Sequence, residues 1–401
     1  MAYLKKSYLQ KGIVSLIEYK LIQKVKVIDT DNLNDTLLDI MNNSNYKRPM
    51  FVFDKFIESL DVVQNVISNF TKYNIDVNSF NEIVPDPPVS LINKGVEKFK
   101  DANCDSLIAI GGGSTIDVAR GINIVRTNGG SILDYEIEKD NIKECPGLIA
   151  VPTTSGTGSE MSNALVLTDT ESKKKIAILA NYALSEYAVL YPQLTLGLPQ
   201  NMTIATGLDA FSHAAEGYLS KLSSPVTDAI CEKIMFLLYN YLPVVVNDGH
   251  NLNARRKVMV ASTLAGWMLN NAGTNIGHSA AHILGSKYHI VHGEAVAYGL
   301  PGVFDLVETE LPEKICEIGQ ILGVTYLETE SVDEKISRAK KAYKKFRDET
   351  IGLHSFSDYK ISKKELETNV NAIVNERFAS NTPVNLNNSN VKMFLEDYGK
   401  Q

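Results

Sequence analysis

The chain has 401 residues, enough for two domains of ordinary size. Hydrophobic residues make up 44% and charged residues 22%, close to the average of folded proteins, which excludes a disordered or fibrous chain. The 40 basic and 47 acidic side chains leave a net charge of −7, which argues against nucleic acid or an anionic membrane surface as a partner.

The cysteines and the apolar runs indicate the cellular compartment in which the protein is found. The four cysteines are far apart and form no CxxC pair, so they predict neither a disulfide framework nor a thiolate metal site. The most apolar stretch, 234–246, is interrupted by Asn240 and Pro243 and is too short to span a membrane. The N-terminal residues lack the apolar core of a signal peptide. We therefore expect a cytoplasmic protein with no membrane-spanning segment.

In the first half of the chain, short apolar runs alternate with helical patterns. The alternation predicts a parallel sheet with helices on both faces. Runs bounded by Gly or Pro are typical of strands buried on both sides, and they occur at 49–53, 106–110, 148–151, 176–179 and 187–191. Apolar residues at helical spacing mark 60–70 and 89–99.

After residue 197 the pattern becomes almost entirely helical. We predict an α/β domain over residues 1–197 and an all-α domain over residues 198–401. The predicted helices of the second domain include 202–219, 226–241, 252–270 and 331–348.

Two loops in the first half have the composition of a phosphate-binding site. Residues 111–114 (GGGS) follow a predicted strand and precede a helix, where glycines allow close approach and the helix N-terminus favours an anion. The alternative is a plain turn in which Ser114 caps the helix and Asp117 completes a capping box. Residues 152–160 (PTTSGTGSE) follow another strand. Because open α/β sheets bind ligands at the carboxyl ends of their strands, the two loops together predict a dinucleotide site.

Asp54 also ends a predicted strand and is a candidate for binding a ribose hydroxyl. It lies upstream of the glycine loop, whereas the usual fingerprint places the acid about 20 residues downstream. Its position alone therefore does not distinguish a ribose ligand from a solvated aspartate.

Histidines are concentrated in the second half. Four of the seven fall between residues 278 and 292, and His278 and His282 share a helix face at a spacing of four. Asp209 and His213 have the same spacing on a predicted helix upstream. Imidazole and carboxylate ligands suit Zn²⁺ or Fe²⁺, so the pattern predicts a divalent metal site. Spacing does not select the ligands, and the candidates are Asp209, His213, Glu216, His278, His282, His289, His292 and Glu294.

Four ordered motifs identify a family. The chain resembles the iron-dependent (group III) alcohol dehydrogenases of the dehydroquinate synthase-like superfamily. The matching segments are 111–117 (GGGSTID), 152–160 (PTTSGTGSE), 207–218 (GLDAFSHAAEGY), and 278–285 (HSAAHILG) with His292 and Gly293.

The resemblance implies specific roles for the matched residues. The metal ligands are then Asp209, His213, His278 and His292, and His282 is a proton relay near the nicotinamide. His289 is not a family ligand. Asp54 matches the acid on the adenosine ribose, which favours NAD(H) over NADP(H). The remaining cofactor residues implied are Gly112, Gly113, Ser114, Asp117, Thr153, Thr154, Thr157, Ser159 and Lys175.

The expected function is therefore an NAD(H)- and metal-dependent alcohol dehydrogenase or aldehyde reductase acting on a short-chain substrate. Residues 287–295 (KYHIVHGEA) are similar to members acting on short aldehydes with an acidic tail, such as succinic semialdehyde or sulfoacetaldehyde. The alternatives are a polyol dehydrogenase of the glycerol or 1,3-propanediol type, and a metal-binding protein without turnover. The family also implies a homodimer or higher homo-oligomer, in which residues 17–28 would form a strand paired across the dimer.

Overall fold

The computed structural model describes residues 18–137, 141–171 and 174–400, which form two compact units. The sheet unit comprises residues 24–206 and 244–266. The helical unit comprises residues 207–243, residues 267 onward and the described residues up to Gln23. This division differs from the segments 1–197 and 198–401, and the domain boundary stays a prediction. The division between the two units falls inside three helices, namely α6 (Gln200–Tyr218), α7 (Pro225–Asn247) and α8 (Leu252–Asn271).

A parallel six-stranded sheet forms the centre of the sheet unit, as predicted. The strand order is β1-β8-β5-β4-β2-β3, and every pairing in it is parallel. The central strands are buried along their whole length because helices cover both of their faces. The strands are β1 (Lys26–Asp29), β2 (Pro49–Val52), β3 (Asn78–Phe80), β4 (Ser106–Gly111), β5 (Leu148–Pro152) and β8 (Tyr187–Leu190).

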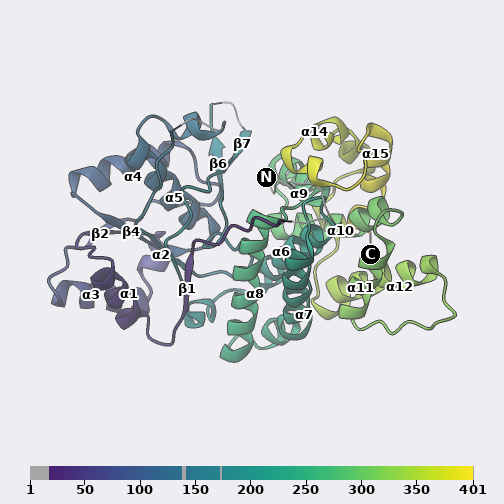
Figure 1. Cartoon of the computed structure of the whole chain (residues 1–401), viewed down its shortest axis with the longest axis horizontal. Helices are drawn as coiled ribbons and strands as arrows, with labels where there is room; N and C mark the ends of the chain where they lie inside the picture. Colours follow the sequence, from purple (N-terminus) through teal and green to yellow (C-terminus); the bar gives the residue numbers. More distant parts are fainter. Residues whose placement is uncertain (1–17, 138–140, 172–173, 401) are drawn as a thin grey trace, which may run out of the picture. The chain divides into compact units, whose positions relative to one another are not determined.

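Helices pack on both faces of this sheet (Figure 1). Alternate residues of each strand face opposite sides, and they separate into two apolar clusters. One cluster joins Phe51 and Ile108 to the buried faces of α1 (Leu33–Asn43) and α3 (Asp61–Lys72). The other joins Val52 and Leu107 to α4 (Ser90–Asp101) and α5 (Gly113–Asn128). The short elements of this unit are α2 (Lys55–Glu58), η1 (Ile132–Tyr135) and η2 (Pro192–Thr195).

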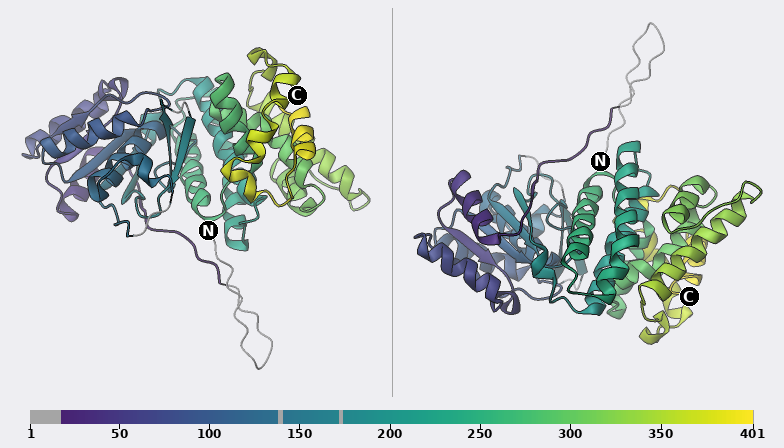
Figure 2. Two further views of the ribbon diagram at one scale, coloured as in Figure 1. Left: turned by 90° about the horizontal axis from the view of Figure 1, so that it is seen from above. Right: turned by 90° about the horizontal axis from the view of Figure 1, so that it is seen from below.

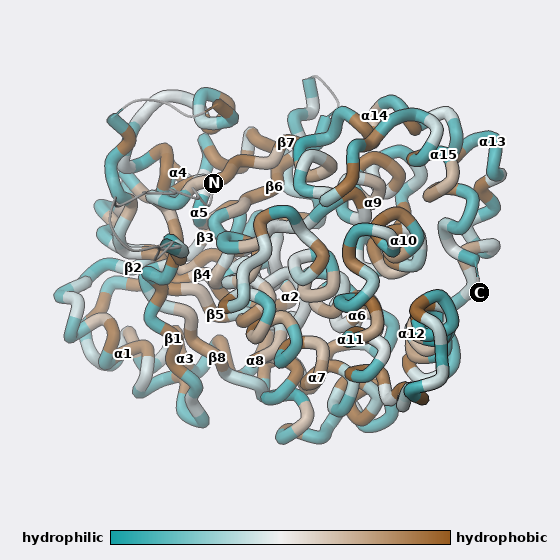
Figure 3. Tube along the Cα trace, turned by 45° about the vertical axis from the view of Figure 1, so that its right-hand side comes forward, coloured by the Kyte–Doolittle hydropathy of each residue, from teal (hydrophilic) through white to brown (hydrophobic). Residues whose placement is uncertain are grey.

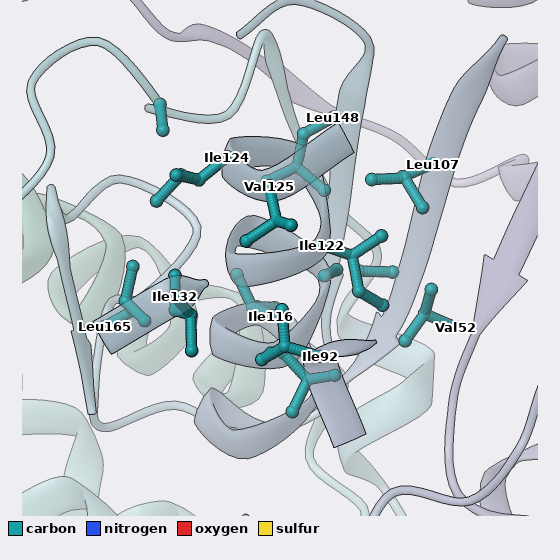
Figure 4. Packing of buried hydrophobic residues seen from close by; sticks show 14 of the residues in the cluster. Val52, Ile92, Leu107, Ile116, Ile122, Ile124, Val125, Ile132, Leu148 and Leu165 are labelled. Carbon is teal, nitrogen blue, oxygen red and sulfur yellow. The ribbon is translucent and has the colours of Figure 1, made fainter. Parts of the chain in front are cut away.

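Helix α5 is buried on nearly all sides. Figure 4 shows its residues Ile116, Ile122 and Val125 among side chains of the strands and of α4. Each fully buried aliphatic side chain of this size contributes about 1.5–3 kcal/mol to folding. The start of α5, where the predicted glycine loop lies, is therefore anchored on a rigid core.

The helices that follow β2 and β4 lie on opposite faces of the sheet. The chain leaves β2 for α2 and α3 on one face, and it leaves β4 for α5 on the other. A crevice forms at such a point beyond the carboxyl ends of the strands, and it is where open α/β sheets bind ligands. Val52 pairs with Ala109, so Asp54 and Gly111 each lie two residues beyond that pair, at neighbouring strand ends.

One predicted strand has a different partner. Residues 176–179 belong to β7 (Lys174–Leu179), which forms an antiparallel pair with β6 (Ala164–Asp169) outside the parallel sheet. The prediction of a buried parallel strand was wrong. The strand β7 begins with two exposed lysines, and buried residues then alternate with partly exposed ones, so only one face is covered. The proposed strand at 17–28 is also shorter in the described residues, where β1 begins at Lys26 and pairs with β8 of the same chain; Ile17 lies outside the described residues.

The helical unit contains no strand among its described residues. Local signals set several of its helix ends: Ser331 and Glu334 form a capping box at α12, and the buried residues Ile336, Ala339 and Tyr343 share one face. Figure 3 shows both hydrophobic and hydrophilic residues along this helix. The elements are α9 (Ile276–Tyr288), α10 (His292–Val307), α11 (Pro312–Ile321), α12 (Val332–Lys345), the π-helical turn η3 (Phe346–Thr350), η4 (Phe356–Tyr359), α13 (Lys363–Glu367), α14 (Val370–Val374), η5 (Arg377–Asn381) and α15 (Asn388–Glu396).

The C-terminal segment folds back onto α9 and α10. In both views of Figure 2 the yellow C-terminal helices lie beside the green helices of the same unit. Phe394 of α15 packs against Gly302 of α10, and Asn381 donates a hydrogen bond to the Thr274 carbonyl before α9. The last hundred residues, which carry no recognisable motif, thus support the histidine-bearing helices.

One helix of the described residues is long and apolar enough to cross a membrane, namely α7. Of its most apolar window, 44% is buried inside the molecule, and Pro243 lies within the helix. The core helix of a soluble protein passes the same test, so this observation is weak evidence for a span.

Candidate active site

Three histidines surround one carboxylate oxygen in the helical unit. The Nε2 atoms of His213, His278 and His292 lie 3.7, 3.7 and 3.6 Å from Asp209 Oδ1. Asp209 and His213 come from successive turns of α6, His278 from the first turn of α9, and His292 from the first residue of α10. The structure therefore places all three predicted histidine ligands near one oxygen of Asp209. The ligand atoms of Asp209, His278 and His292 also lie within 4.8 Å of one another.

This arrangement fits a divalent cation. A tetrahedral ion about 2.1 Å from each ligand separates the ligand atoms by about 3.4 Å, close to the three distances measured from Asp209 Oδ1. Asp209 Oδ1 and His278 Nε2 are buried and have no hydrogen-bond partner among the described residues. Buried polar atoms are normally paired, so these two atoms face a position where a cation satisfies them.

Glu216 orients one of the ligands. Its Oε1 lies 2.7 Å from Nδ1 of His278, and its Oε2 accepts hydrogen bonds from the backbone N–H groups of Asn275 and His278. A carboxylate bound to Nδ1 fixes the ring so that Nε2 points to the metal position. Glu216 was one of the candidate metal ligands suggested by residue spacing. Both of its oxygens are instead bound to His278 and Asn275, so it supports the predicted ligand His278.

The charges of the cluster favour a cation. Burial opposes ionisation of Asp209, but His213, His292 and His278 together hold the pKa of its carboxyl below the usual value. Burial also disfavours the charged form of His278, yet the carboxylates of Glu216 and Asp209 raise its pKa to about 10. Two buried carboxylates thus stabilise positive charge at this position, whether carried by a proton or by a metal ion.

The other candidates lie outside this group of four. His282 packs against His292 with ring centroids 5.4 Å apart, and its Nδ1 contacts Glu376. His289 is exposed and caps the C-terminus of α9 in the left-handed conformation. Glu294 accepts hydrogen bonds from Tyr359 and His354.

The two predicted cofactor loops converge in the sheet unit. Thr153 N–H donates to the Gly111 carbonyl at 3.0 Å, which joins the end of β5 to the end of β4. A Cβ on Gly112 would lie 3.3 Å from Thr154, and one on Gly113 would lie 3.0 Å from Thr157 and 3.3 Å from Ser159. Glycine at both positions therefore lets the first loop approach the hydroxyls of the second without a tight side-chain contact.

No side chain caps the start of α5, and the first N–H groups of a helix have no partner within the helix. Its N-cap is Gly112, with no side-chain hydrogen bond to the cap. The alternative in which Ser114 caps this helix and Asp117 completes a capping box is wrong, because the helix begins at Gly113, before both residues. An uncapped N-terminus beside a cluster of hydroxyls fits the pyrophosphate of a dinucleotide.

Arg120 holds the second loop, and the sequence motifs did not indicate it. Its guanidinium is fully buried and donates to the carbonyls of Ser159, Ala164 (2.6 Å) and Ala183 (3.1 Å). Asp117, 3.5 Å from Arg120, accepts a hydrogen bond from Val166 N–H at 2.9 Å. Both side chains thus tie α5 to the segment that carries the loop. In the sequence Arg120 is marked only by its place about two helical turns after the glycine loop.

The Asp117 carboxyl predicts a pH-dependent stability. Burial raises its pKa from 3.8 to about 6, although Arg120 and Val166 N–H oppose the shift. The folded chain thus binds this proton more tightly than the unfolded chain does, so the contribution to stability is greatest below pH 4 and is lost as pH rises to about 6. Relative to Asp117→Asn, the wild type should lose up to about 3 kcal/mol of unfolding free energy over that range. Urea unfolding of both proteins between pH 4 and 7 measures the difference, and a pH-independent difference would contradict it.

Asp54 and Lys175 already have partners within the sheet unit. Asp54 caps α2, with its Oδ1 accepting from Ile57 N–H at 2.8 Å. Lys175 Nζ binds Asp86 Oδ1 at 2.7 Å and is partly exposed. Neither side chain is buried, so both remain accessible to a ligand.

Comparison with known proteins identifies the family. The iron-containing alcohol dehydrogenase model matches residues 26–192, and the C-terminal model of the Fe-containing alcohol dehydrogenase family matches residues 203–398. The chain is 36% identical over 326 residues to the NAD-dependent methanol dehydrogenase of Bacillus methanolicus, covering 80% of this chain and 84% of that protein. The chain therefore belongs to the iron-containing alcohol dehydrogenase family.

Solved structures have the same fold. A 1,3-propanediol oxidoreductase superposes with a TM-score of 0.87 at 28% identity, covering 94% of this chain and all of that one. The sulfoacetaldehyde reductase of Bifidobacterium kashiwanohense, solved in complex with NAD⁺, superposes with a TM-score of 0.82 at 25% identity, covering 95% and 99%. The chain is thus an enzyme, an oxidoreductase acting on CH–OH groups, and not a metal-binding protein without turnover.

Proposed function

We propose that the chain is an NAD(H)-dependent alcohol dehydrogenase or aldehyde reductase that uses one divalent metal ion and acts on a short-chain substrate. The observation that carries the proposal is the convergence of three imidazoles on one buried Asp209 oxygen, with Glu216 behind His278. Nitrogen and carboxylate ligands suit Fe²⁺ or Zn²⁺.

The residues of the helical unit hold the metal and handle a proton. Asp209, His213, His278 and His292 are the proposed ligands. A bound cation of this kind supplies Lewis-acid polarisation of a substrate oxygen, and NAD(H) supplies the hydride chemistry. His282 lies against His292 and is the proposed relay for the proton of the substrate hydroxyl.

The residues of the sheet unit bind the cofactor. The backbone of Gly112, Gly113 and Ser114 at the start of α5 binds the pyrophosphate, and Asp117 acts through the position of this helix. Hydroxyls of the second loop complete the site, and Lys175 and Asp54 bind the two riboses. The second-loop residues are Thr153, Thr154, Thr157 and Ser159.

The substrate proposal is a small aldehyde or its alcohol. Relatives named for methanol, 1,3-propanediol and sulfoacetaldehyde support a short chain and leave an acidic tail or a second hydroxyl as the variable part. The test is NADH consumption by the Fe²⁺- or Zn²⁺-loaded protein with propionaldehyde, 3-hydroxypropionaldehyde, succinic semialdehyde and sulfoacetaldehyde. A preference for either acid supports the acidic-tail substrate, and a preference for the hydroxyaldehyde supports the polyol type. No consumption with any aldehyde, nor NAD⁺ reduction by the alcohols, would overturn the proposal.

We also propose that the enzyme works in the cytoplasm as a homodimer or higher homo-oligomer. The cytoplasmic location is supported by the widely spaced cysteines, which are free thiols in the described chain. The oligomeric state is what the family resemblance implies. Light scattering of the purified protein tests the oligomeric state, and a monomer at micromolar concentration would contradict it.

Replacing Asp54 should change the preference between cofactors. Its carboxylate would accept a ribose 2′-hydroxyl and repel a 2′-phosphate, so Asp54→Asn and Asp54→Gly should both raise kcat/KM for NADPH relative to NADH by at least about 10-fold, about 1.4 kcal/mol. Asn also serves as an N-cap, whereas Gly has no side-chain oxygen to accept the hydrogen bond from Ile57 N–H. Equal shifts in both variants would assign the effect to the charge. An unchanged NADH to NADPH ratio would refute this role for Asp54.

A further inference from the structure

The ring of His282 contacts two other aromatic rings and is bound at one nitrogen. It stacks on His292 with a centroid distance of 5.4 Å and an interplanar angle of 15°, and Phe378 packs against it at 5.5 Å. Its Nδ1 lies 3.1 Å from Oε1 of Glu376. The side chain keeps 20% of its surface exposed, so the ring is oriented but not sealed from a substrate.

Glu376 is itself fixed from two sides. Its Oε2 accepts hydrogen bonds from the Ser279 hydroxyl at 2.6 Å and from Phe378 N–H at 2.8 Å. The first of these partners lies on α9, one turn before His282, and the second lies in the first turn of η5, which Glu376 caps. Both contacts use Oε2, so Oε1 remains directed at His282.

The contact determines which nitrogen of His282 carries hydrogen. An ionised carboxylate only accepts hydrogen bonds, so Nδ1 must be the donor. In the neutral ring Nε2 is then an acceptor with a free lone pair. In other enzymes too, a carboxylate that accepts a hydrogen bond from Nδ1–H orients a histidine whose Nε2 carries out the function.

We propose that Glu376 is a positioning residue that fixes the tautomer and orientation of His282, so that Nε2 is presented as the acceptor of the substrate hydroxyl proton. The inference rests on the proposed function, because the relay role of His282 belongs to it. No motif contains Glu376, which lies 94 residues after His282 in the chain.

Glu376→Gln separates this role from simple packing. Glutamine has the same shape, and its amide oxygen can still accept from Ser279 and Phe378. The amide NH₂ then faces Nδ1 as a donor and favours the opposite tautomer, with hydrogen on Nε2. Ser279→Ala is the matched control, since it removes one support of the carboxylate and leaves its charge in place.

The experiment measures steady-state kinetics of the metal-loaded enzyme with NAD⁺ and 1,3-propanediol, NADH affinity by fluorescence titration, and bound metal. Glu376→Gln should lower kcat by about 10²–10⁴-fold, with the KM for the alcohol, the Kd for NADH and the metal content changed less than about 3-fold. Ser279→Ala should lower kcat less than about 10-fold. In the His282→Ala background Glu376→Gln should cause no further loss, because the two residues act as one unit.

The kinetic results distinguish failure of the positioning role from failure of the proposed function. An active wild type with an impaired His282→Ala variant and an unimpaired Glu376→Gln variant would overturn the positioning role alone. Additive losses in the double variant, or a loss of metal, would also overturn it and indicate a purely structural carboxylate. Full activity of His282→Ala would remove the relay role and this proposal with it. A wild type inactive on every alcohol and aldehyde would overturn the proposed function itself.

Discussion

Replacing His278 by alanine is expected to abolish metal retention. His278 presents Nε2 to Asp209 and is locked in place by Glu216. Loss of a residue that merely supports a ligand lowers metal affinity about 10–100-fold, so removing a ligand should lower affinity and turnover by at least about 100-fold. NADH affinity should remain nearly unchanged, since the predicted cofactor loops belong to the sheet unit. Elemental analysis after dialysis and NADH fluorescence titration measure the two effects.

His289→Asn is the matched control for this experiment. His289 lies three residues before His292 but is exposed, and its left-handed backbone conformation is one that Asn adopts readily. The variant should keep its metal and its activity. Equal metal content in His278→Ala and in the wild type would refute the ligand assignment. Loss of metal in both variants would show that any change near α9 disturbs the site.

The sequence predicted those parts that local patterns encode. The buried runs 106–110 and 148–151 are apolar between turn signals apart from Ser106, and they form the central strands β4 and β5. The histidines were found because a spacing of four on a helix is itself geometric information: His278 and His282 had to share a face of α9. Which of them face Asp209 is set by how α6, α9 and α10 pack, and spacing left this open.

What the sequence did not reveal depends on contacts between distant segments. Arg120 looks like an ordinary helix residue, and its role appears only when the carbonyls of Ser159, Ala164 and Ala183 converge on it. Glu376 likewise lies in a segment without a motif and acquires a partner only because η5 packs against α9. Arg120 binds carbonyls 39 to 63 residues away, and Glu376 contacts His282 and Ser279, which lie 94 and 97 residues before it. No periodicity marks partners at such separations.

A methyl group added at Gly158 is expected to displace the second cofactor loop. The φ angle of Gly158 is +59°, and its Cβ would lie 2.5 Å from the Cα and N of Gly266 and 2.6 Å from the Ser262 carbonyl. These are backbone atoms of α8, which cannot move aside as a flexible side chain does, and the left-handed conformation alone costs alanine about 1–2 kcal/mol. The loop residues Thr157 and Ser159 flank this position, so the whole second loop should shift.

Gly158→Ala should therefore weaken NADH binding by at least about 10-fold, which corresponds to about 1.4 kcal/mol, while the metal content stays at the wild-type level. Gly197→Ala is the control in the same unit, because no atom lies within 4 Å of a Cβ added there. Fluorescence titration with NADH measures the affinity of both variants. Wild-type affinity in Gly158→Ala would mean that the second loop tolerates the shift and does not contact the cofactor. Reduced affinity in both variants would assign the loss to the glycine substitutions in general. Reduced affinity in Gly158→Ala alone would tie NADH binding to the close approach between this loop and α8.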